Sequence, residues 1–207
     1  MPKATMFDPV SLKREIDEAK HVALERVTAT LASALSGIYG DYEVPDAFPD
    51  AGPLVRLIDP VRIPEDLQAA GSTPAFYIIL STYPVAGNEC TLRRGAMQAI
   101  YRGVAYSPRQ RLTSHLFNSR YNRDFDASKL RYEKERNGAK LFHQQHWPQC
   151  LKLHAGGASG ANIDEGLCRD HSWAVVVHTL KGSSHEVREC AEVAFDRLFR
   201  RPAGSRE

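Results

Sequence analysis

Apolar residues recur at three- and four-residue steps through the first part of the chain, which is the spacing of one buried face of a helix. The stripe consists of Ile16, Ala19, Ala23, Val27, Leu31 and Leu35. Asp8 suits the N-cap, Pro9 suits the first helical position, and Gly37 is typical of a residue that ends a helix. The pattern therefore predicts one long amphipathic helix over residues 8–36.

The rest of the chain contains short, dense apolar runs that predict strands. "AFYIILSTY" (75–83) is rich in β-branched and aromatic residues and is followed directly by a proline. "MQAIYRGVAY" (97–106) and "SWAVVVHTL" (172–180) have the same character. "VRLI" (55–58) is a candidate short strand, and "PEDLQAA" (64–70) is a candidate helical turn.

Two more helices are indicated by their first residues. Ser107 and Pro108 fit the N-cap and first position of a helix that follows the second predicted strand. Ser183 precedes Glu186 by three residues, the spacing of a capping box, and opens the last helix. The buried stripe of that helix is Val187, Ala191, Ala194 and Leu198.

The order of these elements predicts a single α+β domain with a small sheet. Residues 1–71 are a helical N-terminal extension, 72–118 and 172–205 are the core, and 119–171 are an inserted basic region. No apolar run approaches the roughly 18 to 20 residues that span a bilayer, and the N-terminus lacks an apolar signal segment. We therefore expect a soluble, cytoplasmic protein with no membrane partner.

Charge is distributed unevenly along the chain. Residues 1–92 hold 7 Lys/Arg against 13 Asp/Glu, a net charge of −6, whereas residues 93–152 hold 13 against 4, a net of +9. A basic block of this size favours a polyanionic partner, although a solvated basic face remains the alternative. The candidate DNA-contacting residues are Arg102, Arg109, Arg120, Arg123, Lys129, Arg131, Lys134, Arg136 and Lys140.

Four cysteines in 207 residues do not make a disulfide framework, which indicates a reducing compartment. Cys150, His154, Cys168 and His171 form a C-x3-H…C-x2-H series with zinc-like spacing. We interpret this series as a coincidence in a His-rich stretch, and keep structural Zn²⁺ as the alternative.

Five residues whose side chains can carry charge or transfer protons follow one another in a characteristic order. Tyr77 lies in the first long predicted strand and Tyr101 in the second, where Gly103 follows it by two residues. Arg111 comes ten residues after Tyr101, and His115 comes four residues later on the same helical face. In the last helix, Glu192 precedes a proline by ten residues.

This order and spacing resemble the GIY-YIG nuclease family. The resemblance covers roughly residues 72–118 and 172–205, and it implies a small central three-stranded, mainly antiparallel sheet flanked by helices. The literal "GIYG" at 37–40 is not taken as the first motif, because Gly37 is better explained as a helix cap and the residues after Tyr39 are turn-like. We therefore take Tyr77, not Tyr39, as the first motif tyrosine.

This resemblance implies that the chain would hydrolyse phosphodiester bonds. Tyr77 and Tyr101 would face the scissile phosphate, and Tyr77 would act on the attacking water as its base or its orienter. Arg111 would clamp the non-bridging oxygens. His115 would relay the proton or serve as the base. Glu192 would hold Mg²⁺, with Mn²⁺ as the alternative.

The chain departs from the family pattern at several positions. Ala75 and Phe76 replace the Gly-Ile of the first motif, and Arg102 replaces the Ile of the second. Ser205 stands near the place of the terminal Asn and offers one hydroxyl in place of a paired amide. We count Gly103 and Ser205 as supporting residues.

The chain has additional segments around a small core and looks most like a stand-alone type II restriction endonuclease. Such an enzyme would be metal-dependent, would cut double-stranded DNA at a specific site, and would act as a homodimer or higher oligomer, with the long N-terminal helix as the pairing surface. Three alternatives stay open. They are a phage, homing or repair nuclease of the same family, a non-catalytic nucleic-acid-binding protein on this scaffold, and a zinc-stabilised binding protein built on residues 150–171.

Overall fold

The computed structural model describes residues 8–48, 54–117, 163 and 166–205. These residues form an α+β fold whose five strands make one antiparallel sheet in the order β1-β5-β2-β4-β3. The strands are β1 (Val55–Ile58), β2 (Ala75–Ser81), β3 (Arg93–Arg94), β4 (Met97–Ala105) and β5 (Trp173–Thr179). The α+β class agrees with the prediction, but the prediction of three strands is wrong.

The two additional strands lie at the edges of the sheet. β1 pairs with β5, with Val55 opposite His178, so a part of the predicted N-terminal extension belongs to the sheet. β3 is a two-residue strand that turns into β4 through Gly95, which has a positive φ of 55°. A strand of two arginines has no hydrophobic alternation, so no pattern in the sequence predicts it.

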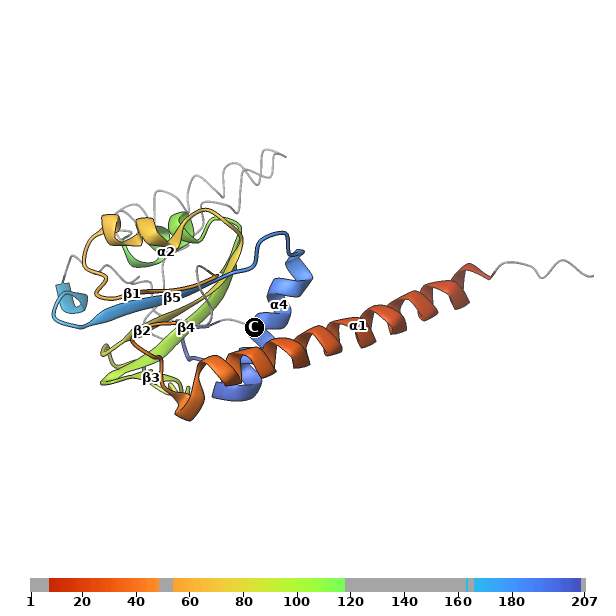
Figure 1. Ribbon diagram of the computed structural model, residues 1–207, viewed down its shortest axis with the longest axis horizontal. Helices are drawn as coiled ribbons and strands as arrows, with labels where there is room; N and C mark the ends of the chain where they lie inside the picture. The colour runs from red at the N-terminus through yellow and green to blue at the C-terminus, as the bar shows by residue number, and fades with distance from the viewer. Residues whose placement is uncertain (1–7, 49–53, 118–162, 164–165, 206–207) are drawn as a thin grey trace, which may run out of the picture.

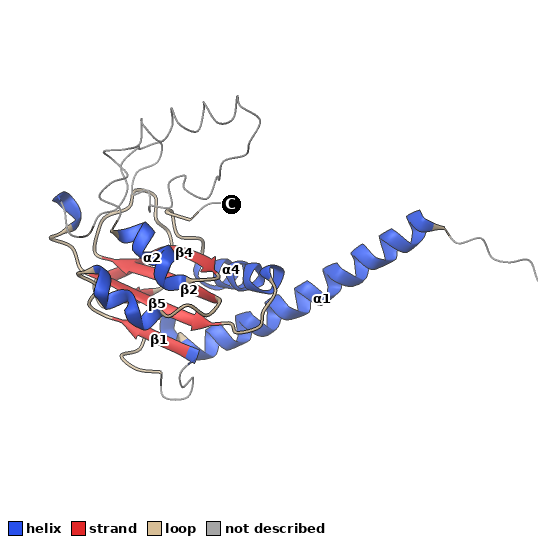
Figure 2. Cartoon of the chain, turned by 90° about the horizontal axis from the view of Figure 1, so that it is seen from above, coloured by secondary structure: helices blue, strands red, loops and turns tan. Residues whose placement is uncertain are grey.

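Helices cover both faces of the sheet (Figures 1 and 2). α2 (Pro108–Leu116) and the 3₁₀ helix η3 (Pro64–Ala70) lie on one face, and α1 (Pro9–Ile38) and α4 (His185–Phe199) lie on the other. Two short 3₁₀ helices, η1 (Gly40–Tyr42) and η5 (Gly166–Cys168), follow α1 and precede β5.

Two predicted helix ends differ from the structure. α1 continues through Gly37 to Ile38 and is capped at Tyr39, because the Tyr39 side chain is buried in the core and its hydroxyl lies 2.5 Å from Nε2 of His178. The N-cap of α4 is Ser184, whose hydroxyl accepts from the Val187 N–H at 3.3 Å. Ser183 instead donates its hydroxyl to the Leu180 carbonyl.

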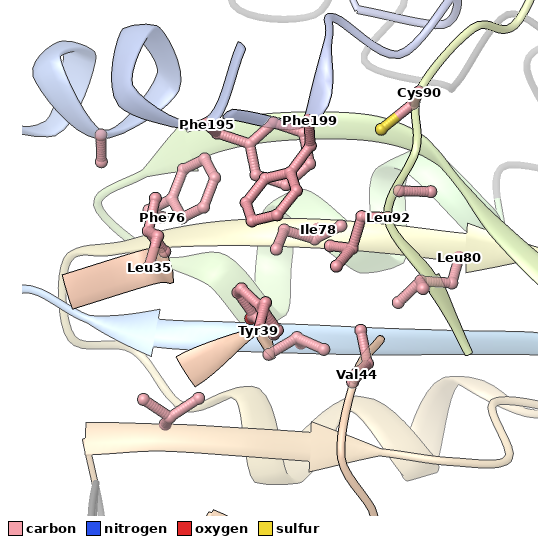
Figure 3. Packing of buried hydrophobic residues seen from close by; sticks show 14 of the residues in the cluster. Leu35, Tyr39, Val44, Phe76, Ile78, Leu80, Cys90, Leu92, Phe195 and Phe199 are labelled. Atoms are coloured by element: carbon pink, nitrogen blue, oxygen red, sulfur yellow. The ribbon is translucent and has the colours of Figure 1, made fainter. Parts of the chain in front are cut away.

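The alternation of side chains along β2 separates two hydrophobic cores. Tyr77 and Ile79 face α2, where they pack with the buried residues Leu112 and Leu116. The opposite core lies between the sheet, α1 and α4 (Figure 3). Its central members are Leu35, Phe76, Ile78, Leu80, Phe195 and Phe199. Strand position therefore assigns Tyr77 and Tyr101 to the α2 face of the sheet.

The N-terminal half of α1 extends beyond the sheet as a long arm (Figure 1). Ion pairs join its middle to α4, from Lys20 to Glu186 and from Glu25 to Arg197. Before that point the large apolar side chains are open to solvent, and Ile16 is 56% exposed. Among the residues that the structure describes, no helix has the length and apolar character needed to cross a membrane.

Candidate active site

Tyr77, Tyr101 and His115 lie together on the α2 face of the sheet, and we call them the tyrosine–histidine cluster. The Tyr77 hydroxyl lies 2.9 Å from Nε2 of His115, and both side chains are buried. The Tyr101 ring stacks with that of Tyr77 at a centroid distance of 6.1 Å and lies 4.8 Å from the His115 ring. Three of the predicted site residues thus lie together.

The pairing of β2 with β4 brings the two tyrosines together. Tyr77 lies opposite Gly103 and Ile79 lies opposite Tyr101, so both tyrosines point to the same face. A Cβ atom at Gly103 would lie 2.7 Å from the Tyr77 hydroxyl and 2.9 Å from Cε1 of Tyr101. Both distances are shorter than a Cβ contact tolerates, so this position requires glycine.

α2 carries Arg111 and His115 one turn apart, and its buried residues Leu112 and Leu116 fasten it to the sheet. Burial and the neighbouring Tyr101 raise the pKa of Tyr77 well above its usual value, whereas the nearby charge of Arg111 lowers it. Burial has the largest effect. The charge of Arg111 does not offset the burial, so Tyr77 is a neutral phenol at neutral pH.

Glu192 lies on the other face of the sheet, in an ion pair with Arg102. Nη1 of Arg102 lies 2.7 Å from Oε1 of Glu192, and Nη2 lies 2.7 Å from Oδ2 of Asp196. Arg201 also contacts Asp196, at 2.9 Å. Burial raises the pKa of Glu192, and the charge of Arg102 opposes that rise. The structure therefore gathers Tyr77, Tyr101, Arg111 and His115 on one face and pairs Glu192 elsewhere.

The prediction that Arg102 contacts DNA conflicts with this pairing. Its side chain is only 8% exposed, and its Nε, Nη1 and Nη2 atoms all bind carboxylates of α4. Arg109 is exposed on the first turn of α2 and remains a candidate. The other predicted contacts lie outside the described residues, namely Arg120, Arg123, Lys129, Arg131, Lys134, Arg136 and Lys140.

A metal ion on Glu192 is not supported by the placement of the carboxylates. Glu192 and Asp196 point at the guanidinium of Arg102, which lies where a cation between them would lie. Within the described part of the chain, no group of three or more His, Cys, Asp or Glu residues is arranged to hold a metal. As placed, these residues do not fit Mg²⁺ or Mn²⁺, so the mechanism below uses only side chains of the protein.

Two members of the zinc-like series, Cys150 and His154, lie outside the described residues. Cys168 is buried, and its carbonyl accepts from Nε1 of Trp173 at 2.9 Å. Nδ1 of His171 lies 3.3 Å from the Thr82 hydroxyl. The zinc alternative thus remains untested.

β3 pairs only with Met97 and Gln98 of β4. The C-terminal segment lies along the next part of the same edge of β4, at Ile100 and Arg102. The Ser205 hydroxyl accepts from the Arg102 N–H at 2.9 Å and lies 3.3 Å from the Arg102 carbonyl. The Gly204 N–H donates to the Ile100 carbonyl at 3.0 Å. Ser205 therefore supports the strand that carries Tyr101.

Sequence reasoning missed Asp196, the second carboxylate on Arg102. The signal was present, because Glu192 and Asp196 are four residues apart on one helical face and Arg102 stands among the apolar residues of a predicted strand. A buried arginine in a strand needs counter-charges, and these two acids provide them.

Comparisons of the chain with models of protein families, with curated proteins and with solved structures gave no match.

Proposed function

We propose that this protein hydrolyses phosphodiester bonds of double-stranded DNA. The observation that carries the proposal is the hydrogen bond between Tyr77 and His115, with Tyr101 stacked beside it and Arg111 one helical turn away. A phenol, an imidazole and a guanidinium in one site are the groups that activate water and bind a phosphate.

The chemistry follows from the neutral state of Tyr77. In this scheme its hydroxyl donates to Nε2 of His115, and a lone pair of the phenol oxygen accepts a hydrogen bond from the attacking water. As the water oxygen attacks phosphorus, the water proton moves to the phenol oxygen and the phenol proton moves to His115. The P–O bond to the leaving oxygen breaks, and that oxygen takes a proton from solvent.

Arg111 supplies the positive charge in this scheme. Its guanidinium is permanently charged and matches two non-bridging oxygens of a phosphate. Charge grows on those oxygens as the fifth bond to phosphorus forms, so the interaction strengthens in the transition state. Removal of one such donor typically raises the barrier by about 3 kcal/mol.

Duplex DNA as the substrate is supported by the basic block of residues 93–152, whose net charge is +9. A protein that neutralises several phosphates binds DNA with strong salt dependence. Site-specific cleavage of the restriction type follows from the family resemblance and is part of the same proposal.

We also propose that two copies of the chain associate through the arm of α1. Leu12, Ile16, Ala19 and Ala23 follow a heptad spacing along the arm, and all four are exposed. In a parallel pair, Asp8 of one copy meets Lys13 of the other. Glu15 meets Lys20 in the same way, on the side where Lys20 also pairs with Glu186 of its own α4. This charge pattern favours a second copy of α1 as the partner.

One observation favours a non-catalytic DNA-binding protein instead. Tyr77 is fully buried, and Glu192 is bound by Arg102, so neither is open to a substrate in this arrangement. The two functions differ in one readout, which is whether the covalent DNA backbone is cut.

The test is incubation with a long unmodified DNA at several salt concentrations, with Mg²⁺, with Mn²⁺ and with EDTA. Discrete bands indicate site-specific cleavage, and a smear indicates non-specific cleavage. Intact DNA that is nevertheless retained by the protein would support the binding protein. Cleavage in EDTA would assign the chemistry to the side chains alone.

A further inference from the structure

A cavity of about 660 Å³ lies at the end of the sheet where β1 ends and β4 and β5 begin. Its floor is apolar, because Val61, Met97 and Trp173 border it and none of them is more than 8% exposed. The Val61 N–H donates to the Trp173 carbonyl at 2.8 Å, which holds two parts of the floor together. Small-molecule sites occupy roughly 300 to 1,000 Å³, so the cavity has the size of a ligand site.

Polar and charged side chains form the rim of this cavity. Arg62, Arg169, Asp170 and Ser172 border it and are exposed, and His171 borders it and is half-buried. Among the residues that the structure describes, the Arg62 guanidinium and the Asp170 carboxylate make no hydrogen bond or ion pair. Both groups are therefore available to a molecule that enters the cavity.

The remaining acid of the cavity is already paired. Asp59 borders it, but Oδ2 of Asp59 lies 2.6 Å from Nε of Arg94. The rim thus offers a ligand one unpaired guanidinium, from Arg62, and one unpaired carboxylate, from Asp170. A guanidinium binds phosphate oxygens in a fork, whereas a carboxylate only accepts hydrogen bonds. A ligand that combines a phosphate with N–H donors matches both.

We propose that this cavity binds one guanine nucleotide. The base lies on the apolar floor, its N1–H and its 2-amino group donate to the two oxygens of Asp170, and the phosphate lies against Arg62. Among the four DNA bases, guanine alone presents two adjacent N–H donors on its pairing edge. The nucleotide belongs to the DNA strand that the tyrosine–histidine cluster cleaves, so the assignment rests on the proposed function. A base of duplex DNA must turn out of the stack to reach such a floor.

The cavity and the tyrosine–histidine cluster lie on the same face of the sheet. Trp173 and Tyr77 belong to one hydrophobic core, and Trp173 lies opposite Ser81, four residues beyond Tyr77 on β2. Four residues of a strand cover about 13 Å, and a strand of duplex DNA covers that distance in about four nucleotides. Ile163 also borders the cavity, and its N–H donates to the carbonyl of Leu116 at the end of α2. One DNA strand can therefore occupy both places.

Isothermal titration calorimetry of the full-length chain tests the cavity directly. The two probes are deoxyguanosine and deoxyinosine 5′-monophosphate (dGMP and dIMP), which differ only in the 2-amino group. Wild type should bind dGMP about 10-fold more tightly than dIMP, because dIMP leaves one carboxylate oxygen unpaired. Asp170→Asn should narrow this difference, whereas Arg62→Gln should weaken both nucleotides by about 10-fold and keep their ratio.

Competition with DNA identifies the source of the nucleotide. Fluorescence anisotropy of a labelled duplex is measured with and without saturating dGMP at constant ionic strength, and the DNA is checked afterwards for integrity. A nucleotide supplied by the DNA predicts that dGMP weakens duplex binding about 10-fold, and that Arg62→Gln removes this sensitivity. An unchanged duplex affinity would show that the cavity takes a free nucleotide and would refute DNA as its source.

Matched controls come from exposed residues of α1. Arg14→Gln and Asp17→Asn remove the same two charges away from the cavity, and both should bind dGMP as the wild type does. If the wild type gives no heat with millimolar dGMP, or binds dGMP and dIMP alike, the guanine site is wrong, and DNA cleavage decides the proposed function separately. If dGMP binds but DNA is neither bound nor cleaved, the proposed function fails and the cavity is a site for a free nucleotide.

Discussion

Tyr77 and His115 are joined by a hydrogen bond of 2.9 Å, although they lie 38 positions apart in the sequence. One comes from the central strand β2 and the other from the short helix α2, so the bond exists only when the sheet and the helix are packed together. A buried phenol hydroxyl bonded to an imidazole is a pair through which a proton can pass, and the account of function depends on it.

Gly103→Ala should destabilise the protein and abolish the activity. The new methyl group would lie 2.7 Å from the Tyr77 hydroxyl, so the two tyrosines must move apart. Overpacking of this kind costs about 1 to 3 kcal/mol of unfolding free energy, measured by urea denaturation.

Gly37→Ala is the matched control. Gly37 lies within α1, no atom lies within 4 Å of an added Cβ, and alanine is the better helix former. This variant should gain up to about 1 kcal/mol and keep its activity. Equal stability of the two variants would contradict the close contact at Gly103.

Much of this arrangement was predictable from the sequence, because the three long strands, the helices and the positions of Tyr77 and Tyr101 follow from hydrophobic runs and turn residues. The partners of buried polar groups were not predictable. Arg102 lies in the basic block of residues 93–152 and was predicted to contact DNA, yet two carboxylates of α4 bind it. Such pairing is decided by tertiary packing, which no local pattern encodes.

The same limit applies to Tyr39, which the sequence placed after the end of α1. Its burial against His178 extends the helix past Gly37. Gly37 is therefore an interior residue of α1 and not the residue that ends it, the position that a glycine near a helix end often takes.

Stability should fall at acidic pH because of His178. Burial lowers the pKa of this histidine to about 4 from its usual 6.5. The unfolded chain therefore binds a proton below pH 6.5, while the folded protein stays neutral there until about pH 4. The contribution of neutral His178 to the free energy of unfolding is fully present above pH 6.5. As the pH falls from 6.5 to about 4, the free energy of unfolding declines by up to about 3 kcal/mol.

Urea denaturation at pH 7.5, 6, 5 and 4.5 measures this decline. His178→Gln should give a flatter pH profile than the wild type. A variant of the exposed residue His21, His21→Gln, should keep the wild-type slope. Parallel profiles for wild type and His178→Gln would exclude His178 as the cause.

Arg102→Met should lower the free energy of unfolding by about 1 to 3 kcal/mol, because it leaves the partly buried carboxylates of Glu192 and Asp196 without the guanidinium between them. Arg102→Met combined with Glu192→Gln should recover part of that loss. Arg93→Met, at an exposed residue of β3, is the control and should change stability little. A mild effect of Arg102→Met would show that the pair is dispensable.

The arm of α1 should mediate self-association. Sedimentation velocity of the wild type at rising concentrations should reveal a dimer, and Leu12→Glu with Ile16→Glu should shift it to monomer. Val10→Glu changes an exposed apolar residue outside the heptad stripe and should leave the dimer intact. A wild type that stays monomeric at every concentration would refute the pairing surface.

DNA cleavage by the wild type beside Tyr77→Phe and His115→Gln tests the central claim most directly. General acid–base catalysis contributes about 10²- to 10⁴-fold, so each variant should cleave at least 100-fold more slowly while circular dichroism and DNA affinity stay as in the wild type. Tyr42→Phe, at an exposed tyrosine, should retain full activity. Wild-type rates in Tyr77→Phe and His115→Gln, or no cleavage by the wild type under any metal or salt condition, would contradict the account.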